Sequence, residues 1–495
     1  MRNKKAAAAA LTLLLLAPLG AQSRRPPNPF REPDRKLWAE IDKNNELMAN
    51  LEHLCDMIGP RLTGTDKARQ ANQWTLEKFQ AYGAEARLEA FTIGNGWRRS
   101  TASGRIVEPA AHPLTVASAG WAPSTSGPVR GALMYVKADK PEDLEQFKGK
   151  LGGKILITTE PARIGEAPRA LDAAEALRGE RGRDELNLSF EDRARLRRQM
   201  NDLYKKEGVT AILRESSKEH GLLNMTGVSP GGYQIAAIPT AFLIHEDYAR
   251  LWRLLQRKLP VEIELDIRNE ITTGPVEVYN TVAEIRGSEK PEEIVLVGAH
   301  LDSWDLGSGA TDNATGSAVT LEAARAIQAS GLRPKRTIRF ALFMGEEQGL
   351  NGSRAYVRDH KDQLERHQGV VIHDTGTGRV RSFSLESRYD VREALDKIAE
   401  PLREAGLEEL SMRRTSGSDH VPFRDAGVPA FFGIQDPAEY RKTHHSQSDT
   451  FDKIRKEDLV QGAKVVAAMA WNLADYPDKL PRKTPPPAPA GTSKR

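Results

Sequence analysis

The chain has 495 residues, of which 39% are hydrophobic and 28% are charged, and its formal net charge is +4. This length and composition predict a soluble globular protein with room for two domains. Residues 1–25 and 479–495 contain Lys and Arg but no Asp or Glu, so the rest of the chain is net acidic. This distribution of charge argues against a nucleic-acid partner.

The first 21 residues have the layout of a cleavable secretory signal. A cationic opening at residues 2–5 precedes an apolar run over residues 6–19, and small residues follow at positions 20 and 21. The run is shorter than the roughly 20 apolar residues of a membrane helix, and no later segment approaches that length, so we expect no membrane span in the mature chain. We therefore predict an exported protein, periplasmic or secreted, with a retained N-terminal anchor as the alternative.

The two ends of the remaining chain are predicted to carry no chemistry. Pro and Arg predict a flexible lead-in over residues 22–36, and Pro-rich, low-complexity sequence predicts a disordered tail over residues 478–495. Cys55 is the only cysteine, so the chain cannot be stabilised by an intramolecular disulfide even in an oxidising compartment.

Between these ends, the sequence predicts a main domain that an insertion interrupts. The apolar spacing in residues 37–82 indicates amphipathic helices, which open the main domain over residues 37–104. Short β-rich runs then replace this pattern, so residues 105–273 are predicted to form a mainly β module with a charged, helix-prone stretch at 170–207. The main domain resumes over residues 274–477.

Strands alternate with helices in this second part of the main domain. The expected strands are residues 294–299, 337–344 and 370–373, and the expected helices are residues 314–330 and 353–366. Such alternation predicts βαβ units and therefore an α/β fold, with a mostly parallel central sheet flanked by helices.

Polar residues follow each of these three strands. His300 follows the first, Glu346 and Glu347 follow the second, and Asp374 follows the third. Ligands of open α/β sheets bind beyond the carboxyl ends of the strands, so we expect these side chains to share one edge of the sheet. The two adjacent glutamates must diverge, which suits one metal ligand and one unligated base that takes a proton from metal-bound water. Any one of these residues alone is more often structural, but the repetition at three strand ends favours a site.

Two further candidates would complete a metal centre. Asp312 lies between a Gly-rich loop and a predicted helix, where capping of the helix is the rival role. His445 lies in a polar loop before a predicted C-terminal helix, and His444 competes for the same role. Two His, two Asp and one Glu form a mixed nitrogen and oxygen set that suits zinc better than manganese or cobalt. Five ligands indicate two metals that share a bridging carboxylate.

These motifs resemble the co-catalytic di-zinc exopeptidases, in the branch of zinc aminopeptidases and plasma glutamate carboxypeptidase (carboxypeptidase Q). The matching stretches, which recur in the family's order and spacing, are GAHLDSWDLGSGATDNATG, RTIRFALFMGEEQGLNGS, SGSDHVPFRDAGVPA and HHSQSDT. With IGPRLTGTDKARQANQWTLEKF, the resemblance covers roughly residues 50–104 and 275–475. It implies the zinc-exopeptidase fold, with a protease-associated-like domain as the insertion. The match of the insertion is weaker and rests on stretches such as KLGGKILIT.

Carried over by position, the resemblance implies a role for each site residue. It implies two Zn²⁺ per chain, held by His300, Asp312, Glu347, Asp374 and His445. Asp312 would be the bridging carboxylate and Glu346 the general base. Asp302, two residues after the first ligand, would be the carboxylate that orients His300, as such partners of metal-binding histidines do.

The resemblance also bears on the two positions that the residues alone leave open. It favours His445 over His444, because His445 lies four residues before Asp449, as the family's ligand does. Ser418 and the two residues after it resemble a stretch near the family's substrate pocket, but no catalytic role follows for them. The transition-state donor stays unassigned, because no Tyr stands just before Ser418.

The implied reaction is hydrolysis of short peptides by an aminopeptidase or dipeptidase. A zinc-bound water, deprotonated by Glu346, would attack a peptide carbonyl polarised by one zinc, and Glu346 would pass the proton to the leaving amine. The alternatives are a single-zinc acyltransferase similar to glutaminyl cyclases and a non-catalytic, receptor-like binding protein. All five ligand positions are retained, which counts against both. The sequence leaves open the side-chain preference, the terminus recognised and the quaternary state, including a homodimer.

Overall fold

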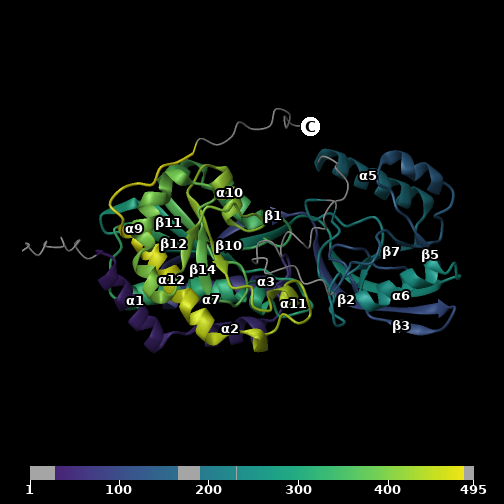
Figure 1. Ribbon diagram of the computed structural model, residues 1–495, viewed down its shortest axis with the longest axis horizontal. Coiled ribbons are helices and arrows are strands. Elements are labelled where there is room, and N and C mark those ends of the chain that lie inside the picture. The colour runs from purple at the N-terminus through teal and green to yellow at the C-terminus, as the bar shows by residue number, and fades with distance from the viewer. Residues whose placement is uncertain (1–27, 165–189, 230, 484–495) are drawn as a thin grey trace, which may run out of the picture.

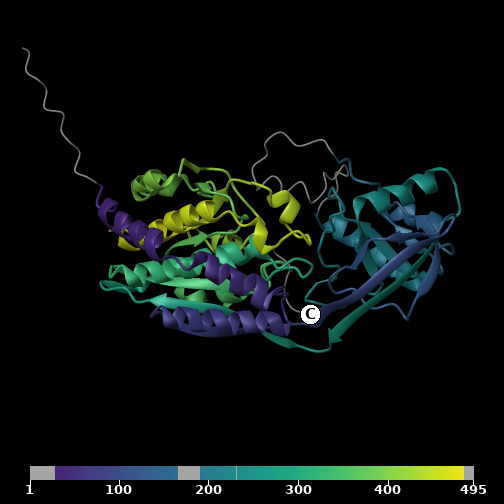
Figure 2. The same cartoon turned by 90° about the horizontal axis from the view of Figure 1, so that it is seen from below.

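The computed structural model describes residues 28–164, 190–229 and 231–483. Two eight-stranded sheets, each covered by helices, form two lobes that lie side by side (Figures 1 and 2). We call the lobe built from residues 28–95 and 273–483 the body. The lobe built from the described residues between 96 and 272 is the inserted domain. The expected α/β fold is therefore confirmed.

The body sheet has parallel central strands, with an antiparallel pairing on each side of them. In spatial order its strands are β1 (Glu85–Ile93), β10 (Val276–Ile285), β12 (Arg336–Phe343), β11 (Lys290–His300), β13 (His367–Ile372), β16 (Ala430–Gln435), β14 (Val380–Ser384) and β15 (Glu409–Ser411). Strands β12, β11, β13 and β16 run parallel to one another. Every residue of β12 and β13 is buried, as expected of central strands covered on both faces.

Helices cover both faces of the body sheet. The helices, including short 3₁₀ and π segments (η), are α1 (Arg31–Asn44), α2 (Leu47–Glu52), η1 (His53–Ile58), α3 (Asp66–Ala81), η3 (Ala310–Ala314), α7 (Thr315–Ala329), α8 (Asn351–Asp359), η4 (Lys361–Arg366), η5 (Tyr389–Val391), α9 (Arg392–Ala399), η6 (Pro401–Ala405), α10 (His420–Asp425), α11 (Tyr440–Thr443), η7 (Phe451–Lys453) and α12 (Lys456–Asp475). Helices α7 and α12 belong to the larger apolar core, together with α1, α2 and α3. Helices α8 and α10 supply Tyr356 and Phe423 to a smaller core, which holds residues of the opposite sheet face such as Leu296.

The inserted domain is built on its own mixed sheet. In spatial order its strands are β3 (His112–Leu114), β2 (Gly96–Glu108), β9 (Glu262–Thr272), β5 (Val129–Tyr135), β6 (Ile155–Ile157), β7 (Ala211–Glu215), β8 (Thr240–Leu243) and β4 (Val116–Ser118). Its helices are η2 (Pro141–Phe147), α5 (Phe190–Glu207) and α6 (His245–Gln256). Helix α6 packs in one apolar cluster and α5 in another, so both contribute to the domain's core.

Two antiparallel strand pairs carry the chain between the lobes. Strands β1 and β10 pair in the body sheet, and their continuations β2 and β9 pair in the second sheet. The predicted boundary at residue 105 falls within β2, whose whole length from Gly96 belongs to the second sheet. No change in composition marks position 96, because the chain is extended strand on both sides of it.

The predicted lead-in is wrong at its C-terminal side. Helix α1 begins at Arg31, so the flexible segment does not reach residue 36. Pro33 occupies the first turn, where a missing N–H costs nothing, and Glu32 and Asp34 are acidic residues at the helix N-terminus, where they are favoured. Arg31 forms ion pairs with glutamates of the body.

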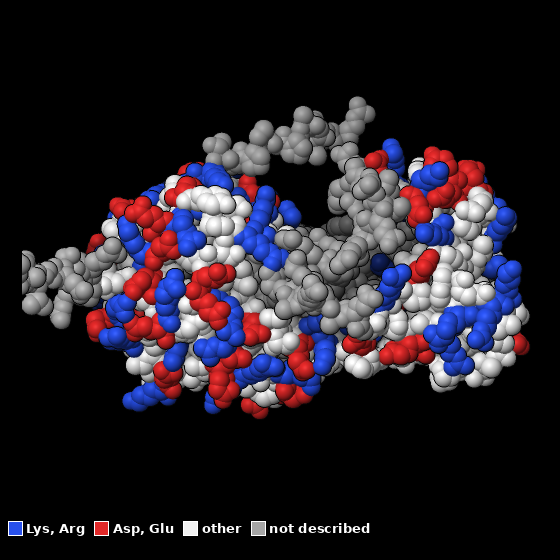
Figure 3. All heavy atoms as spheres, in the orientation of Figure 1, with Lys and Arg blue, Asp and Glu red and all other residues white. Residues whose placement is uncertain are grey.

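The predicted disordered tail is also too long. Residues 478–483 pack on the body: Leu480 is buried, and its N–H donates to Gln368 Oε1 (3.0 Å). The rest of the predicted tail and the predicted signal over residues 1–21 lie outside the described residues. Among the helices that the structure describes, none combines the length and apolar character needed to cross a membrane. On the face drawn in Figure 3, acidic and basic side chains are interspersed over both lobes.

Candidate metal centre

Three parallel strands end at one edge of the body sheet and bring the predicted residues there. His300 is the last residue of β11, Glu346 and Glu347 follow β12, and Asp374 follows β13. The strand register pairs His300 with Phe343, the last residue of β12. This edge is the place that the sequence predicted for the site.

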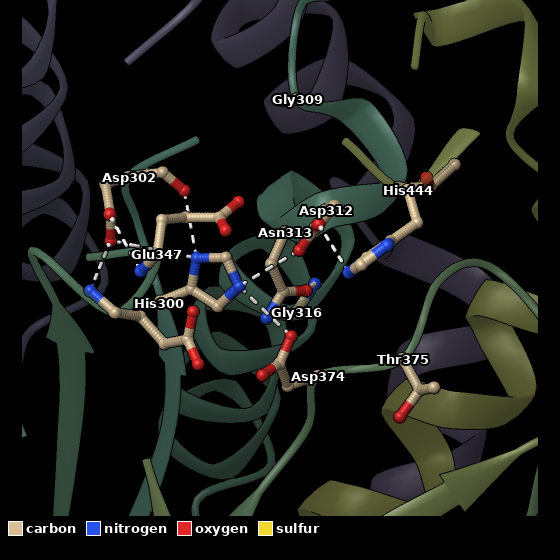
Figure 4. A network of polar contacts seen from close by, with 12 residues as sticks. His300, Asp302, Gly309, Asp312, Asn313, Gly316, Glu347, Asp374, Thr375 and His444 are labelled. Carbon is tan, nitrogen blue, oxygen red and sulfur yellow. Dashed lines mark hydrogen bonds and ion pairs between the residues drawn. The ribbon is translucent and has the colours of Figure 1, made fainter. Parts of the chain in front are cut away.

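The imidazole of His300 is the centre of a first cluster. Its Nε2 lies 3.1 Å from Asp374 Oδ1 and 3.2 Å from Asp312 Oδ1, and its Nδ1 lies 2.9 Å from the main-chain oxygen of Asp302 (Figure 4). Donation from Nδ1–H to that carbonyl would leave the Nε2 lone pair free for a metal ion placed between the ring and the two carboxylates. One ring nitrogen and two carboxylate oxygens in a buried place form a donor set for a divalent cation.

A second cluster forms on the other side of Asp312. His445 Nε2 lies 2.8 Å from Glu347 Oε2 and 3.4 Å from Asp312 Oδ2. The neighbouring His444 stacks on the His445 ring, and its Nε2 lies 3.7 Å from Asp312 Oδ2. Either histidine is therefore close enough to Asp312 to bind the same metal ion. His445 also contacts Glu347, the other residue predicted to bind a metal ion in this cluster.

Asp312 lies between the two clusters and is held there by its main chain. Its Oδ1 faces His300 and its Oδ2 faces the second cluster (Figure 4). The N–H groups of Thr311 and Asp312 donate to the Asp449 carboxylate at 2.6 and 3.1 Å. Asp449, which sequence reasoning used only to place His445, thus fixes the segment that carries the central carboxylate.

The capping role weighed for Asp312 is wrong. Helix α7 begins at Thr315, and Asn313 is the side chain that accepts from its first turn, with the Gly316 N–H donating to Asn313 Oδ1 (2.8 Å). Asp312 itself has non-helical backbone angles and directs its side chain to the histidines. Asn313 therefore caps the helix, and the Asp312 carboxylate is available for the metal site.

Asp302 contacts more than the His300 ring. Its main-chain oxygen is closer to His300 Nδ1 than its carboxylate, whose Oδ1 lies at 3.7 Å. The carboxylate accepts from the N–H of Glu346 (3.2 Å), from the N–H of Glu347 (3.4 Å) and from Thr63 Oγ1 (3.0 Å). Asp302 therefore links the end of β11 to the turn that presents both glutamates.

The site gathers more buried acid than the described protein groups neutralise. Burial raises the pKa of Asp302, Glu346, Glu347, Asp419 and Asp449, and repulsion from a neighbouring carboxylate raises it further in all of these but Asp302. Among the described residues, Asp312 Oδ2 and Glu347 Oε1 are buried without a hydrogen-bond partner. Buried carboxylate oxygens left without donors beside histidine side chains fit bound cations, so the residues present suit a metal centre.

Arg61 is a component of this region that sequence reasoning missed. Its guanidinium is fully buried and donates to main-chain oxygens on both sides of the site: Leu54, Gly59, Leu301, Ser308 and Gly309. It thereby joins the N-terminal helices to the loop between His300 and Asp312. A lone Arg after Gly-Pro carries no local pattern that would mark this role.

A small pocket opens beside the second cluster. It is lined by Trp304, Gly307, Gly309, Asp312, Glu347, His445, Ser446 and Asp449. The indole of Trp304 lies edge-on to the His445 ring, with 6.1 Å between ring centroids. This pocket therefore places Trp304 and Asp449 beside the second cluster. Trp304 was also missed, because a single Trp in a loop is more often simply a core residue.

The stretch that begins at Ser418 divides between two environments. Asp419 is buried near the first cluster and accepts from Ser353 Oγ (2.5 Å). His420 contacts different residues: its Nε2 lies 3.0 Å from Thr415 Oγ1 and 3.7 Å from Glu386 Oε1. These contacts therefore give His420 a structural role in the body.

Comparison with known sequences agrees with this geometry. Residues 280–470 match the model of Peptidase family M28. Carboxypeptidase Q of Rattus norvegicus is 30% identical over 442 residues, which cover 88% of this chain and 87% of that protein. The similarity thus extends over both lobes.

Comparison with solved structures gives the same picture. A Peptidase M28 precursor from Shewanella amazonensis SB2B has a TM-score of 0.77 and 28% identity, covering 92% of this chain and 99% of that one. A zinc aminopeptidase from Bacillus subtilis has a TM-score of 0.61 at 21% identity and covers 88% of this chain and 98% of that one. At that identity, the second likeness concerns the fold alone.

Proposed function

Because the chain belongs to peptidase family M28 and is a metallopeptidase, we propose that it is a zinc-dependent exopeptidase that hydrolyses short peptides with two metal ions. The full-length similarity to carboxypeptidase Q supports an exopeptidase. The buried set of His, Asp and Glu donors supports zinc as the metal. The choice between aminopeptidase, dipeptidase and carboxypeptidase depends on which substrate terminus is recognised.

One observation carries the proposal for two metals: the Asp312 carboxylate faces a different histidine with each of its oxygens. His300 and Asp374 would hold one ion, His445 and Glu347 the other, and Asp312 would bridge them. His, Asp and Glu donors suit zinc, and a pair of zinc ions activates water and polarises the substrate carbonyl.

Glu346 is proposed as the general base. It is adjacent to the proposed ligand Glu347 but is not needed as a ligand, and its N–H is held by Asp302. The residue is 9% exposed, so it is shielded from bulk water, and it follows β12 at the edge of the sheet where the other site residues converge. From there it would take the proton of the attacking water and pass it to the leaving amine.

The test combines metal content with turnover. The chain without its first 21 residues is assayed on a panel of dipeptides, aminoacyl anilides and N-blocked peptides, beside Glu346→Gln. We expect two zinc ions per chain, and a Glu346→Gln variant that keeps both but loses activity by about 10³-fold or more. One zinc per chain would contradict the bridged centre, and an active Glu346→Gln variant would contradict the base. Preference for a free amino or carboxyl terminus within the panel identifies the exopeptidase subtype.

Export is the remaining part of the proposal. The cationic and apolar opening of the chain supports cleavage after about residue 21, and delivery to the periplasm or the medium. Mass spectrometry of the mature N-terminus, together with fractionation, tests this. Recovery of the intact N-terminus from a membrane fraction would instead indicate a retained anchor.

A further inference from the structure

We propose that the inserted domain positions the metal ligand His445, so that the second metal position forms only where the two lobes meet. This inference rests on the proposed function, because it takes His445 as a ligand. It assigns to the inserted domain a direct part in the metal centre. The segment responsible is residues 218–225, which we call the clamp.

The clamp bonds to the loop that carries His445 at several points. The Met225 N–H donates to the main-chain oxygen of His445 itself (2.7 Å). Two residues further on, Gln447 makes a two-point contact: the Leu223 N–H donates to its Oε1 (2.8 Å), and its Nε2 donates to the oxygen of Gly221 (3.0 Å).

A fourth bond holds the other side of the same loop. The Nζ of Lys218, a nearly buried side chain, donates to the main-chain oxygen of Arg441 (3.0 Å). Helix α11, which begins the loop, lies on the side of the body that faces the inserted domain (Figures 1 and 2). The clamp therefore fixes the loop both before and after the two histidines.

Apolar packing continues from the clamp into the body. Leu223 and Met225 are buried in the same apolar cluster as the helices and central strands of the body. Trp304, which lies against the His445 ring, fits over Gly120 of the inserted domain, where an added Cβ would come within 2.7 Å of the indole. The second metal position is thus enclosed by contributions from both lobes.

The backbone of His445 shows why such support matters. Its φ is +54°, in the left-handed region that a residue with a side chain seldom adopts. Such a conformation persists when surrounding contacts determine it, and here the carbonyl of that same residue accepts from the clamp. On the body side, Asp449 fixes the later part of the loop through Thr311 and Asp312. The clamp supplies the matching constraint next to the ligand.

Gln447 is the residue through which this role can be tested without touching a ligand. Gln447→Ala removes both side-chain bonds to the clamp, and Gln447→Glu keeps the acceptor for the Leu223 N–H but loses the donor to Gly221. Lys218→Met tests the other end of the clamp. The matched control is Gln146→Ala, because Gln146 is an exposed glutamine of the inserted domain that donates within its own helix.

The measurement is the dissociation constant of each zinc, from competition with a chelating indicator, for the whole chain and each variant. We expect Gln447→Ala to weaken the more weakly held zinc by about 10- to 100-fold, as loss of outer contacts to a metal ligand does. Gln447→Glu and Lys218→Met should show smaller effects and Gln146→Ala none. The melting temperature of the metal-free chain should change little, and saturating zinc should restore kcat.

An affinity for the weaker zinc that stays within twofold of wild type in both Gln447→Ala and Lys218→Met would overturn the inference. A His445→Ala arm separates this from failure of the proposed function. If the wild type binds one zinc, or if His445→Ala binds both as tightly as wild type, the two-metal site itself is wrong. If His445→Ala loses one zinc but the clamp variants do not, the site stands and the clamp alone is refuted.

Discussion

The two halves of the proposed metal centre are supported in different ways. His300 ends an eleven-residue strand in the middle of the body sheet, and Asp374 follows the neighbouring strand. His445 lies instead in an irregular loop, in a left-handed backbone conformation, and bonds to a clamp more than 200 positions away in sequence. One half belongs to the sheet of a single lobe, while the other depends on the meeting of two lobes.

This difference shows how a metal-binding side chain on a loop can be positioned as firmly as one on a strand. Strands position side chains well because their main-chain hydrogen bonds and packing fix both neighbours. A loop lacks that support and obtains it from outside contacts. Here the outside contacts are the N–H groups of Thr311 and Asp312, which donate to Asp449 of the loop, and the clamp of the inserted domain. Three predictions examine this contrast, beginning with the residue that both halves share.

Replacing Asp312 should weaken both halves of the proposed metal centre at once. Asp312→Asn leaves the shape of the side chain but removes the charge between the two clusters, so we expect both zinc ions to bind at least 100-fold more weakly and hydrolysis to fall by about 10³-fold or more. Zinc titration and kcat/KM on the best dipeptide measure the two effects. The control is Asp452→Asn, because Asp452 is an exposed acidic residue just after the same loop. Retention of one tightly bound zinc would show that the halves do not share Asp312.

Replacing Arg61 should weaken the body and leave the inserted domain intact. Arg61→Lys leaves several buried main-chain oxygens without a donor, so we expect the body to lose about 3–4 kcal/mol of stability. Hydrogen exchange reports the two lobes separately and should show lower protection around the loop after β11, with the strands β5 to β8 unchanged. Arg98→Lys, in an exposed ion pair of the inserted domain, should change neither. Equal loss in both lobes would mean that they unfold as one unit.

A pH effect of smaller size should also be confined to the body. Burial raises the pKa of Asp34, which accepts from Asn472 of α12, from its ordinary value of 3.8 to about 7. Because the folded pKa is the higher one, the stability contribution of this group is complete below about pH 3.8 and is lost as the pH rises through 7. The free energy of unfolding of Asp34→Asn should therefore rise relative to that of the wild type by about 2–3 kcal/mol as the pH is raised from 4 to 8.

Denaturant unfolding of the metal-free chains at pH 4, 6 and 8 measures this gain. Asp42→Asn, an exposed acid of the same helix, provides the control. A constant difference between Asp34→Asn and wild type at all three pH values would show that Asp34 does not titrate in this range. Hydrogen exchange at the same pH values reports the lobes separately, and an equal change of protection in the inserted domain would contradict the separation of the two lobes.

Much of the body was predictable because the relevant patterns are local. The apolar runs before His300, Glu346 and Asp374 predicted three central strands, and the structure contains them as β11, β12 and β13. Parallel strands bring their carboxyl ends to one edge, so the meeting of these side chains followed from strand order alone. The ligand and base roles remain proposals, because their assignment depends on bound metal and substrate.

The errors and omissions lie where local pattern and final contact differ. The start of α1 at Arg31 was hidden by a Pro-rich stretch whose Pro33 is compatible with a first helical turn. The capping role was expected for Asp312 because it precedes a predicted helix in sequence, but the structure shows that Asn313 caps this helix. The buried contacts of Arg61 connect segments about 240 positions apart, which no pattern within either segment reveals.

The sequence by itself determined the family of the protein, the α/β sheet and the edge at which the candidate residues gather, because strand order and residue type follow from short stretches of chain. The tertiary structure alone decided that Asp312 faces both histidine clusters, that His445 reaches Glu347, and that the inserted domain bonds to the loop of His445. These contacts depend on how the two lobes pack against each other. That packing is set by apolar and main-chain contacts between distant segments, so no local periodicity records it.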